Sequence, residues 1–278
     1  MVAFLLANDD LNENSISKNY KVASSSHKRG SRMNNINPTK VAVITGAGGA
    51  IGGGIAVKLA SEGYSVVLTD LKNDAVQSQA SKIEGALAFA ADLRNESEVL
   101  ALHEFVTEKL GTATLLVNAA GVFFEHKLTE TTVEQFDLLI DANLKGTFLT
   151  CKTFIPEMIA NGGGSIVNIA STAGLYASST RPLYSVAKAG VIMLTRSITV
   201  DYGSKGIRAN VICPGLIDTP MADWITSRPE ALKAWEANLP AGRIGTVEDI
   251  SKAVSFLASE NSSYMHAGIM VVDGGGRP

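Results

Sequence analysis

Residues 40–52, KVAVITGAGGAIG, decide the fold of this chain. The apolar, β-branched run from Val41 to Thr45 predicts a short buried strand. Residues 55–63 repeat apolar side chains at helical spacing, so a helix is expected directly behind the glycines. A glycine-rich turn between a strand and a helix lets the backbone approach a pyrophosphate, which then lies against the unpaired N–H groups of the helix. The stretch therefore indicates a dinucleotide-binding turn.

A carboxylate at the end of the next expected strand supports this interpretation. Residues 65–70, SVVLTD, end in Asp70, close to the offset of about 20 residues typical of the acid that binds a ribose. An ordinary loop aspartate is the alternative. The glycine turn contains no basic residue, and none follows Asp70 before Lys72. Because a carboxylate repels a 2′-phosphate, the sequence favours NAD(H), with NADP as the alternative.

Strands and helices alternate through the rest of the chain. Strands are expected over residues 40–45, 65–70, 86–92, 114–121, 165–171, 208–215 and 269–275. Helices are expected over 55–63, over 97–111, behind a capping-box sequence at 132–135, through Tyr184 to about residue 201, and over 247–259. Uniformly apolar strands are covered on both faces, as parallel strands are. We predict an α/β fold, a single-domain doubly wound parallel sheet that is Rossmann-like with three layers.

Composition excludes several other classes. The chain has 278 residues, of which 46% are hydrophobic and 18% charged, and its net charge is −3. This balance gives no electrostatic reason to expect nucleic acid or a membrane surface as a partner, and no apolar run approaches bilayer length. Cys151 and Cys213 are isolated and the four histidines form no ligand cluster, so no metal site and no zinc alcohol dehydrogenase is expected. We predict buried thiols and a cytoplasmic protein.

The first 37 residues have a different character. They are polar, rich in serine and asparagine, and without sustained periodicity. They predict a disordered extension over residues 1–37 in front of a domain at 38–278. The apolar segment VAFLLA, residues 2–7, is too short for a signal sequence. The acidic residues after it argue against a transit peptide. A start of translation at Met33 is a second interpretation that stays open.

Residues 183–189, LYSVAKA, carry the second chemical signal. Tyr184 and Lys188 are four residues apart, so on a helix they lie one turn apart on the same face. Of the six tyrosines, only Tyr184 has a lysine at the fourth position after it. A solvated helix face also produces such pairs, so the weight of this one depends on the rest of the chain.

From about Pro38 the chain resembles the classical type of the short-chain dehydrogenase/reductase family. Residues 45–52 match its glycine motif, except that Ala50 stands where a glycine is usual. Residues 118–121, NAAG, match its NNAG-like motif with alanine at the second place. Ser171 lies 13 residues before Tyr184, which is the spacing of the catalytic serine in that family. Further matches are Asp92 near the adenine, Asn143 in ANLKG, and Pro214-Gly215 with Thr219 at the nicotinamide carboxamide.

The resemblance implies roles for four polar residues. Tyr184 is the implied general acid/base, and Lys188 is implied to favour its phenolate and to bind the nicotinamide ribose. Ser171 is implied to hydrogen-bond the substrate oxygen, and Asn143 to hold a water in a proton relay. Because a free tyrosine with a pKa near 10 is a poor base at neutral pH, the lysine and a positive nicotinamide ring are expected to lower that pKa. Each residue alone could instead have a structural role.

NAD is the expected cofactor. The implied cofactor contacts are Gly46, Gly49, Ala50, Ile51, Gly52, Asp70, Asp92, Leu93, Asn118, Ala119, Gly121, Tyr184, Lys188, Pro214, Gly215, Ile217 and Thr219.

The expected function is that of an NAD(H)-dependent oxidoreductase, which interconverts a neutral secondary alcohol and its ketone. The alternatives are an NADPH-dependent 3-oxoacyl-[acyl-carrier-protein] reductase and a non-catalytic dinucleotide-binding redox sensor. The complete set of four polar residues favours an enzyme, because a sensor would not need it. A homotetramer is implied by the resemblance alone.

The residues expected around the reacting carbon are mostly apolar and aromatic: Phe123, Phe124, Ala173, Leu175, Tyr176 and Leu183, with Met221 and Trp224 from the loop over 216–243. A charged substrate group would normally meet an arginine or lysine. Arg181 is the one nearby exception, and the sequence does not give its direction. We therefore expect a small-molecule alcohol or ketone that is neutral at its reactive end.

Overall fold

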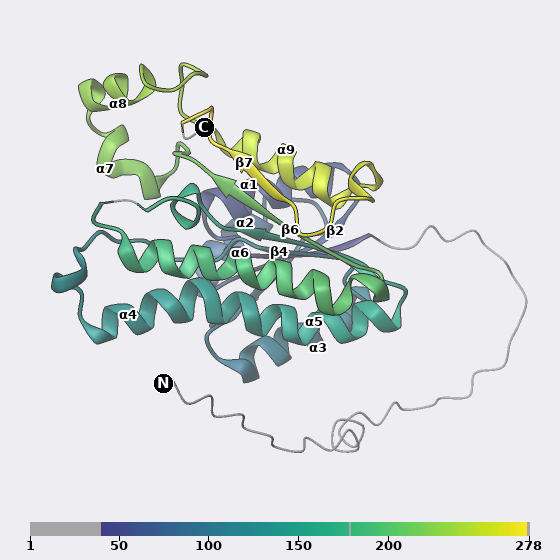
Figure 1. Cartoon of the computed structure of the whole chain (residues 1–278). Helices are drawn as coiled ribbons and strands as arrows, with labels where there is room; N and C mark the ends of the chain where they lie inside the picture. The colour runs from purple at the N-terminus through teal and green to yellow at the C-terminus, as the bar shows by residue number, and fades with distance from the viewer. Residues whose placement is uncertain (1–39, 178, 277–278) are drawn as a thin grey trace, which may run out of the picture. The chain divides into compact units, whose positions relative to one another are not determined.

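The computed structural model describes residues 40–177 and 179–276 (Figure 1). The predicted extension over residues 1–37 and the predicted start of the domain at residue 38 lie outside the described residues, and both stay predictions.

A parallel sheet forms the centre of the described chain. Its seven strands stand in the order β3-β2-β1-β4-β5-β6-β7, and every neighbouring pair is parallel. The bounds are β1 Val41–Thr45, β2 Ser65–Asp70, β3 Leu87–Ala90, β4 Leu115–Asn118, β5 Gly164–Ile169, β6 Ile207–Pro214 and β7 Ile269–Val272. The predicted doubly wound parallel sheet is confirmed.

Helices cover both faces of this sheet, which gives the three predicted layers (Figure 1). Helices α1 (Ala50–Ser61), α2 (Asn73–Ala80) and α9 (Val247–Ala258) bury side chains in one apolar cluster. Helices α3 (Glu96–Leu110), α5 (Gly146–Ala160) and α6 (Pro182–Tyr202) contribute to the cluster on the other face.

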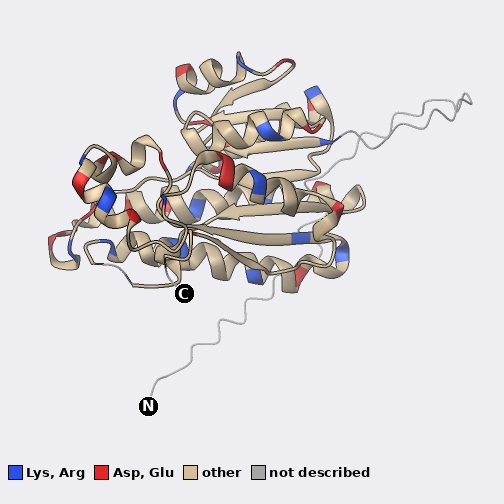
Figure 2. Ribbon diagram, turned by 90° about the horizontal axis from the view of Figure 1, so that it is seen from above, with Lys and Arg blue, Asp and Glu red and all other residues tan. Residues whose placement is uncertain are grey.

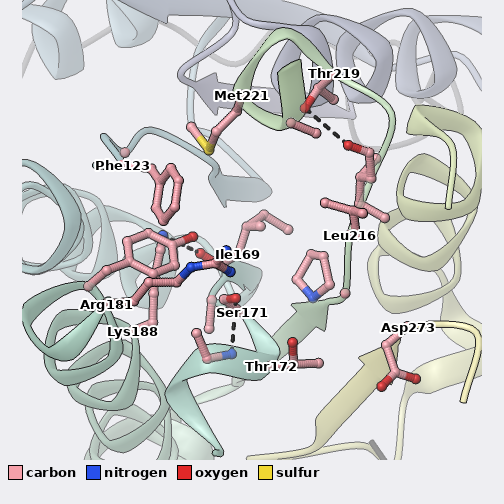
Figure 3. A pocket seen from close by; sticks show the side chains of 18 of the residues that line it. Phe123, Ile169, Ser171, Thr172, Arg181, Lys188, Leu216, Thr219, Met221 and Asp273 are labelled. Atoms are coloured by element: carbon pink, nitrogen blue, oxygen red, sulfur yellow. Dashed lines mark hydrogen bonds between the residues drawn. The ribbon is translucent and has the colours of Figure 1, made fainter. Parts of the chain in front are cut away.

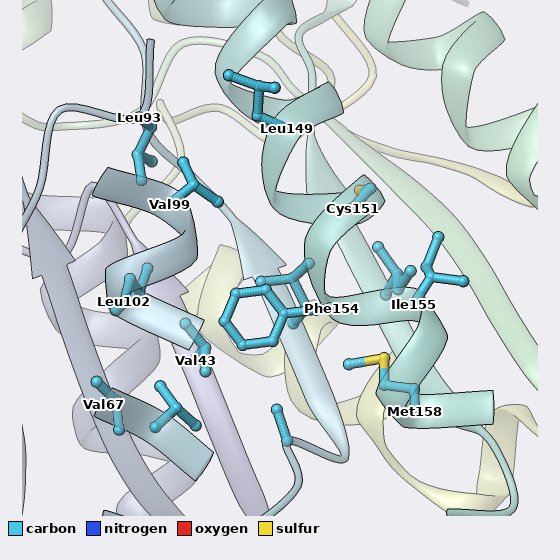
Figure 4. Close-up of a cluster of buried hydrophobic side chains, with 14 of the residues drawn as sticks. Val43, Val67, Leu93, Val99, Leu102, Leu149, Cys151, Phe154, Ile155 and Met158 are labelled. Carbon is cyan, nitrogen blue, oxygen red and sulfur yellow. The ribbon is translucent and has the colours of Figure 1, made fainter. Parts of the chain in front are cut away.

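Strand β1 explains why two cores are needed. Ala42 and Ile44 point into the first cluster, whereas Val41 and Val43 point into the second, because successive strand residues face opposite sides. Figure 4 shows Val43 in the second cluster with Phe154 from α5. Because this strand is buried on both faces, its sequence does not alternate apolar and polar residues.

Several helices of the structure are not predictable from apolar periodicity. Helix α2 buries only Val76 and Ala80, and the short helices α7 (Asp223–Thr226) and α8 (Pro229–Glu236) lie in the expected substrate loop. The capping box expected at 132–135 does open α4 (Val133–Ile140), with Thr132 and Gln135 bonded reciprocally. Helices with a weak or short apolar face give little periodic signal, so α2, α7 and α8 were not predicted from the sequence.

Helix α6 spans Pro182–Tyr202, which agrees with the helix expected through Tyr184 to about residue 201, but it is more apolar than expected. By length and composition alone, residues 182–205 could cross a bilayer. Leu183, Ala187, Val191 and Ile198 are buried on one side of the helix, which is typical of a core helix of a sheet protein. Lys188 and Arg196 interrupt the apolar residues, so the sequence shows no continuous apolar run of bilayer length.

The strand order places a crevice beside β1. The chain runs outward from β1 to β2 and β3, then returns to add β4 on the other side of β1. In parallel sheets, ligands bind at the carboxyl ends of the strands where the order reverses in this way. Thr45 pairs in register with Thr69 and with Asn118, so the three strands end level at that edge.

Candidate active site

The glycine turn follows β1 at this edge. Gly46 has a φ of 64°, and a Cβ there would lie 2.7 Å from the Cα of Ala120. A Cβ on Gly52 would collide with the carbonyl oxygen of Gly46. Gly49 caps α1 without a side-chain hydrogen bond, so no side chain covers the first N–H groups of the helix. Ala50 has no positive φ, which explains why alanine is tolerated where a glycine is usual.

Asp70 ends β2 directly beside this turn. Its Oδ2 accepts a hydrogen bond from the N–H of Gly48 at 3.1 Å, and its Oδ1 accepts one from the N–H of Lys72 at 3.2 Å. The structure therefore brings the predicted ribose-binding acid to the glycine turn and fixes its carboxylate there.

The end of β4 is joined to the end of β1. The Thr45 hydroxyl accepts hydrogen bonds from the N–H groups of Ala119 and Ala120, both at 3.1 Å. The Asn118 side chain is 3% exposed and donates to Asn168 Oδ1 at 2.8 Å. Asn118 is thus committed to the core, and only its backbone is available for the cofactor contact predicted from the sequence.

The predicted adenine contacts lie after β3. Arg94 holds the Asp92 carboxylate in a fork, with Nε at 2.8 Å from Oδ1 and Nη2 at 2.6 Å from Oδ2. The hydrogen bonds from Arg94 hold the pKa of Asp92 below its usual value. Leu93 is buried. The sequence gives no signal for Arg94, which places a guanidinium at the carboxylate expected near the adenine.

The segment after β6 forms the opposite wall. The N–H of Gly215 donates to the carbonyl oxygen of Val272 at 3.0 Å, and a Cβ at Gly215 would lie 2.7 Å from the Cβ of Asp273. Thr219 donates its hydroxyl to the carbonyl oxygen of Ile217 at 3.2 Å. Strand β7 and the residue after it thus pack closely against the Pro214-Gly215 segment.

These walls enclose a cavity of about 770 Å³ (Figure 3). The predicted site residues that line it are Ile51, Ala119, Gly121, Asn143, Ser171, Tyr184, Lys188, Pro214, Gly215, Ile217 and Thr219. The other predicted site residues do not line it and lie in or beside the segments that follow β1 to β4: Gly46, Gly49, Ala50, Gly52, Asp70, Asp92, Leu93 and Asn118. The structure thus unites the expected nicotinamide and catalytic residues in one cavity.

Ser171, Tyr184 and Lys188 converge on this cavity from two elements. Ser171 follows β5, while Tyr184 and Lys188 lie in the first two turns of α6. Ser171 Oγ accepts a hydrogen bond from the N–H of Ala173 at 3.1 Å, and the Ser171 side chain acts to lower the pKa of Tyr184. Lys188 Nζ lies 5.7 Å from the centre of the Tyr184 ring. It donates to the carbonyl oxygen of Ile169 at 3.0 Å (Figure 3).

Asn143 reaches the same cavity from a π-helical turn, Asp141–Lys145, between α4 and α5. Its Nδ2 donates to the carbonyl oxygens of Val122 and Leu139, both at 3.0 Å. Its buried Oδ1 has no hydrogen-bond partner among the described residues. Single π turns are frequent at functional sites, and a buried acceptor without a protein partner suits an ordered water.

The pKa of Tyr184 departs from the expectation. Burial raises it above its usual value, while the hydrogen bond with Ser171 and the charge of Arg181 act in the opposite direction. Burial also lowers the pKa of Lys188 to about 8. The expectation that Lys188 lowers the pKa of Tyr184 is therefore wrong for the protein without coenzyme, because burial of the phenol outweighs the hydrogen bond with Ser171 and the charge of Arg181.

The outer wall is largely as expected. Phe123, Ala173, Tyr176, Met221 and Trp224 line the cavity, together with Arg181, Trp235 and Leu239. The expectation is wrong for three residues. Leu183 is buried in the core, Leu175 packs on the cluster under α6, and Phe124 lines a second, smaller cavity. Asn238 and Asp273 also line the large cavity, and no motif points to them.

Comparison with known proteins adds three findings. The family model described as enoyl-(acyl carrier protein) reductase matches residues 46–276. The 2-(R)-hydroxypropyl-CoM dehydrogenase of Xanthobacter autotrophicus is 37% identical over 244 residues, which cover 85% of this chain and 98% of that protein. The 3-oxoacyl-[acyl-carrier-protein] reductase FabG of Thermotoga maritima is 32% identical, covering 85% and 97%.

Solved structures agree with these relatives. A structure from Agrobacterium tumefaciens, provisionally described as a gluconate dehydrogenase, superposes with a TM-score of 0.82 at 31% identity. The match covers 85% of this chain and 95% of that one. Sequence and fold therefore point to the same group of proteins.

Proposed function

The chain belongs to the short-chain dehydrogenase/reductase family of oxidoreductases, and on this premise we propose that it interconverts a neutral secondary alcohol and its ketone with NAD(H). The observation that carries the proposal is the convergence of Ser171, Tyr184 and Lys188 on one cavity beside the glycine turn. A dinucleotide-binding sensor would have no use for this polar set.

The described residues fit a nicotinamide dinucleotide. Gly46 and Gly52 keep the turn free of side chains, and Asp70 stands beside that turn. Asn143 Oδ1 is a buried acceptor that has no partner in the part of the chain that the structure describes. When bound, the nicotinamide ring supplies or accepts the hydride.

The proton chemistry falls to the residues of the chain. In ketone reduction, the Tyr184 phenol donates its proton to the carbonyl oxygen, and the Ser171 hydroxyl donates a hydrogen bond to the same oxygen. With its pKa near 8, Lys188 is still an ammonium at neutral pH and stabilises the phenolate that Tyr184 becomes. Asn143 Oδ1 would hold a water that passes a proton from the solvent toward Lys188 and Tyr184, which restores the phenol.

Asp70 supports NAD(H) over NADP(H). Its carboxylate can accept hydrogen bonds from ribose hydroxyls but repels a 2′-phosphate. Lys72 is the nearest basic residue in the sequence, and only its backbone N–H is bonded to Asp70.

The apolar wall supports a substrate that is neutral at its reactive end. Phe123, Met221, Trp224 and Trp235 supply most of the large side chains around the cavity. An unpaired charge in such surroundings is unfavourable by several kcal/mol. The alternative is an NADPH-dependent 3-oxoacyl-[acyl-carrier-protein] reductase, which is favoured by the similarity to the FabG reductase of Thermotoga maritima.

We also propose that the protein is a homotetramer and that it lies in the cytoplasm. Large apolar side chains are exposed along α4, α5 and α6: Val133, Phe136, Leu138, Phe148, Val186, Met193 and Val200. A second group, Phe256, Tyr264 and Val271, is exposed near α9 and β7. Two separate apolar surfaces suit two kinds of subunit contact. In Figure 2, lysine and arginine positions are interspersed with aspartate and glutamate, which offers no reason to propose a polyanionic partner.

A panel of substrates tests the reaction. Neutral alcohols and ketones, 3-oxoacyl thioesters and 3-oxo acids are compared by kcat/KM, with the absorbance of NADH as the readout. Neutral ketones are expected to be the best substrates. A preference of tenfold or more, about 1.4 kcal/mol, for thioesters or acids would replace the proposal with the acyl reductase alternative.

A further inference from the structure

Arg181 and Glu125 form an ion pair in the wall of the substrate cavity. Glu125 Oε1 lies 2.7 Å from Arg181 Nη2 and accepts a hydrogen bond from Nε at 2.8 Å. Arg181 lines the large cavity, whereas Glu125 lines a second cavity of about 390 Å³. Phe123, Met221 and Trp224 line both cavities, so the pair crosses the wall that the two cavities share.

Two aromatic rings fix the guanidinium of Arg181. Its Cζ lies 4.8 Å from the ring centre of Trp224. It lies 5.2 Å from the ring centre of Phe123, which stands beside Arg181 in Figure 3. Arg181 Nε donates its N–H to Glu125, Nη2 makes an ion-pair contact with the same oxygen, and the guanidinium makes no other hydrogen bond to the described residues. A stacked guanidinium loses little freedom on binding, so these remaining donors are prepared for an acceptor in the cavity.

The backbone beside Arg181 is held in an unusual conformation. Thr180, a β-branched residue, has a φ of 61°, and among the described residues only Ala267 shares a positive φ without being glycine. The N–H of His126 donates to the carbonyl oxygen of Thr180 at 2.9 Å, which joins the two segments that carry the ion pair. Such strained residues cluster at ligand-binding sites, where the surrounding structure maintains them.

We propose that the Arg181–Glu125 pair determines the charge selectivity of the substrate cavity. Arg181 donates hydrogen bonds to a neutral oxygen at the far end of the substrate, and Glu125 cancels the charge that would otherwise attract an anion. A carboxylate at Arg181 would share the guanidinium with Glu125, and the two like charges would repel. A carboxamide accepts the same hydrogen bonds without that repulsion. This inference rests on the proposed function and deepens it by naming the polar group of the substrate.

Levulinamide and levulinate test it, since they are ketones that differ only in a neutral or charged far end. Binding of each to the full-length protein saturated with NADH is measured by isothermal titration calorimetry. Levulinamide is expected to bind at least about tenfold more tightly than levulinate. In Glu125→Gln this preference should shrink by about tenfold, because levulinate binds more tightly. Glu130→Gln is the matched control, because it removes the same charge five residues further along the chain. Glu130 lines neither cavity, so this variant should leave the preference unchanged.

The double variant Glu125→Gln/Arg181→Gln should lose the gain in levulinate binding. An unchanged preference in Glu125→Gln overturns the inference, and so does a wild-type complex that prefers levulinate or fails to bind levulinamide. Oxidation of NADH by both ketones is followed in parallel. If neither ketone is reduced while binding follows the expected pattern, the proposed reaction fails and the charge selectivity stands.

Discussion

Lys188 lies with its Nζ 5.7 Å from the ring centre of Tyr184, one helical turn away on α6. The same Nζ is anchored by the carbonyl oxygen of Ile169 at 3.0 Å. The lysine is 5% exposed, and burial lowers its pKa to about 8. The fold thus keeps the Lys188 ammonium in a poorly solvated position at neutral pH. There it can stabilise a neighbouring phenolate, but its burial reduces the stability of the folded state.

Replacement of Lys188 by methionine should therefore stabilise the protein while it impairs turnover. A shift of the pKa from 10.5 to about 8 corresponds to roughly 3 kcal/mol of unfavourable free energy at pH 7. Loss of the hydrogen bond to Ile169 offsets about 1 kcal/mol of the gain. We expect Lys188→Met to raise the free energy of unfolding by about 2 kcal/mol in urea denaturation without coenzyme, against a change within about 0.5 kcal/mol for the exposed Lys252→Met.

The pH dependence of this difference has a definite sign. Below pH 8 both the folded and the unfolded chain carry the protonated lysine, so the full unfavourable term is present. Between pH 8 and about 10.5 the folded state loses the proton first, and the stability of the unsubstituted protein rises relative to the variant. A difference that stays constant or grows over this range would show that Lys188 is not the buried cation described above.

Asp70 should control the choice of coenzyme. Its removal in Asp70→Ala takes away both the ribose acceptor and the charge that repels a 2′-phosphate. The ratio of kcat/KM for NADH over NADPH should fall by about tenfold or more, whereas the exposed Asp74→Ala on α2 should leave it unchanged. If the unsubstituted protein uses NADPH as well as NADH, the assignment of Asp70 is wrong.

A buried polar chain links the sheet to α6. Asn118 donates to Asn168, and Asn168 donates to the Thr195 hydroxyl at 2.9 Å. Thr195→Val keeps the shape of the side chain but leaves the Asn168 amide without that acceptor. We expect a loss of about 1–3 kcal/mol in the free energy of unfolding. Thr107→Val, which removes a hydroxyl from the exposed side of α3, should change it by no more than about 0.5 kcal/mol.

The fold was predictable because its decisive signals are local. The run from Val41 to Thr45, the glycines behind it and Asp70 all report on chain segments of a few residues, and the parallel sheet follows from their alternation with helices. Helices α7 and α8 have too short an apolar face to be recognised in the same way.

The candidate site was predictable only in part. Ser171, Tyr184 and Lys188 follow a fixed spacing, and the structure brings them together with Asn143. Arg94 and Glu125 have no such spacing, because each acts through a partner that only the folded chain reveals. The raised pKa of Tyr184 has the same origin, since desolvation depends on the packing around the phenol and not on its neighbours in sequence.

The substitution Tyr184→Phe tests the central claim most directly. It keeps the ring that packs edge-on against Phe123 at 5.1 Å but removes the proton that ketone reduction requires. Turnover of the best neutral ketone, followed by NADH absorbance, should fall by about 10²–10⁴-fold. Binding of NADH should be retained, and Tyr202→Phe at the end of the same helix should keep full turnover. Near-normal turnover by Tyr184→Phe with NADH bound as before would contradict the assignment of Tyr184 as the general acid/base.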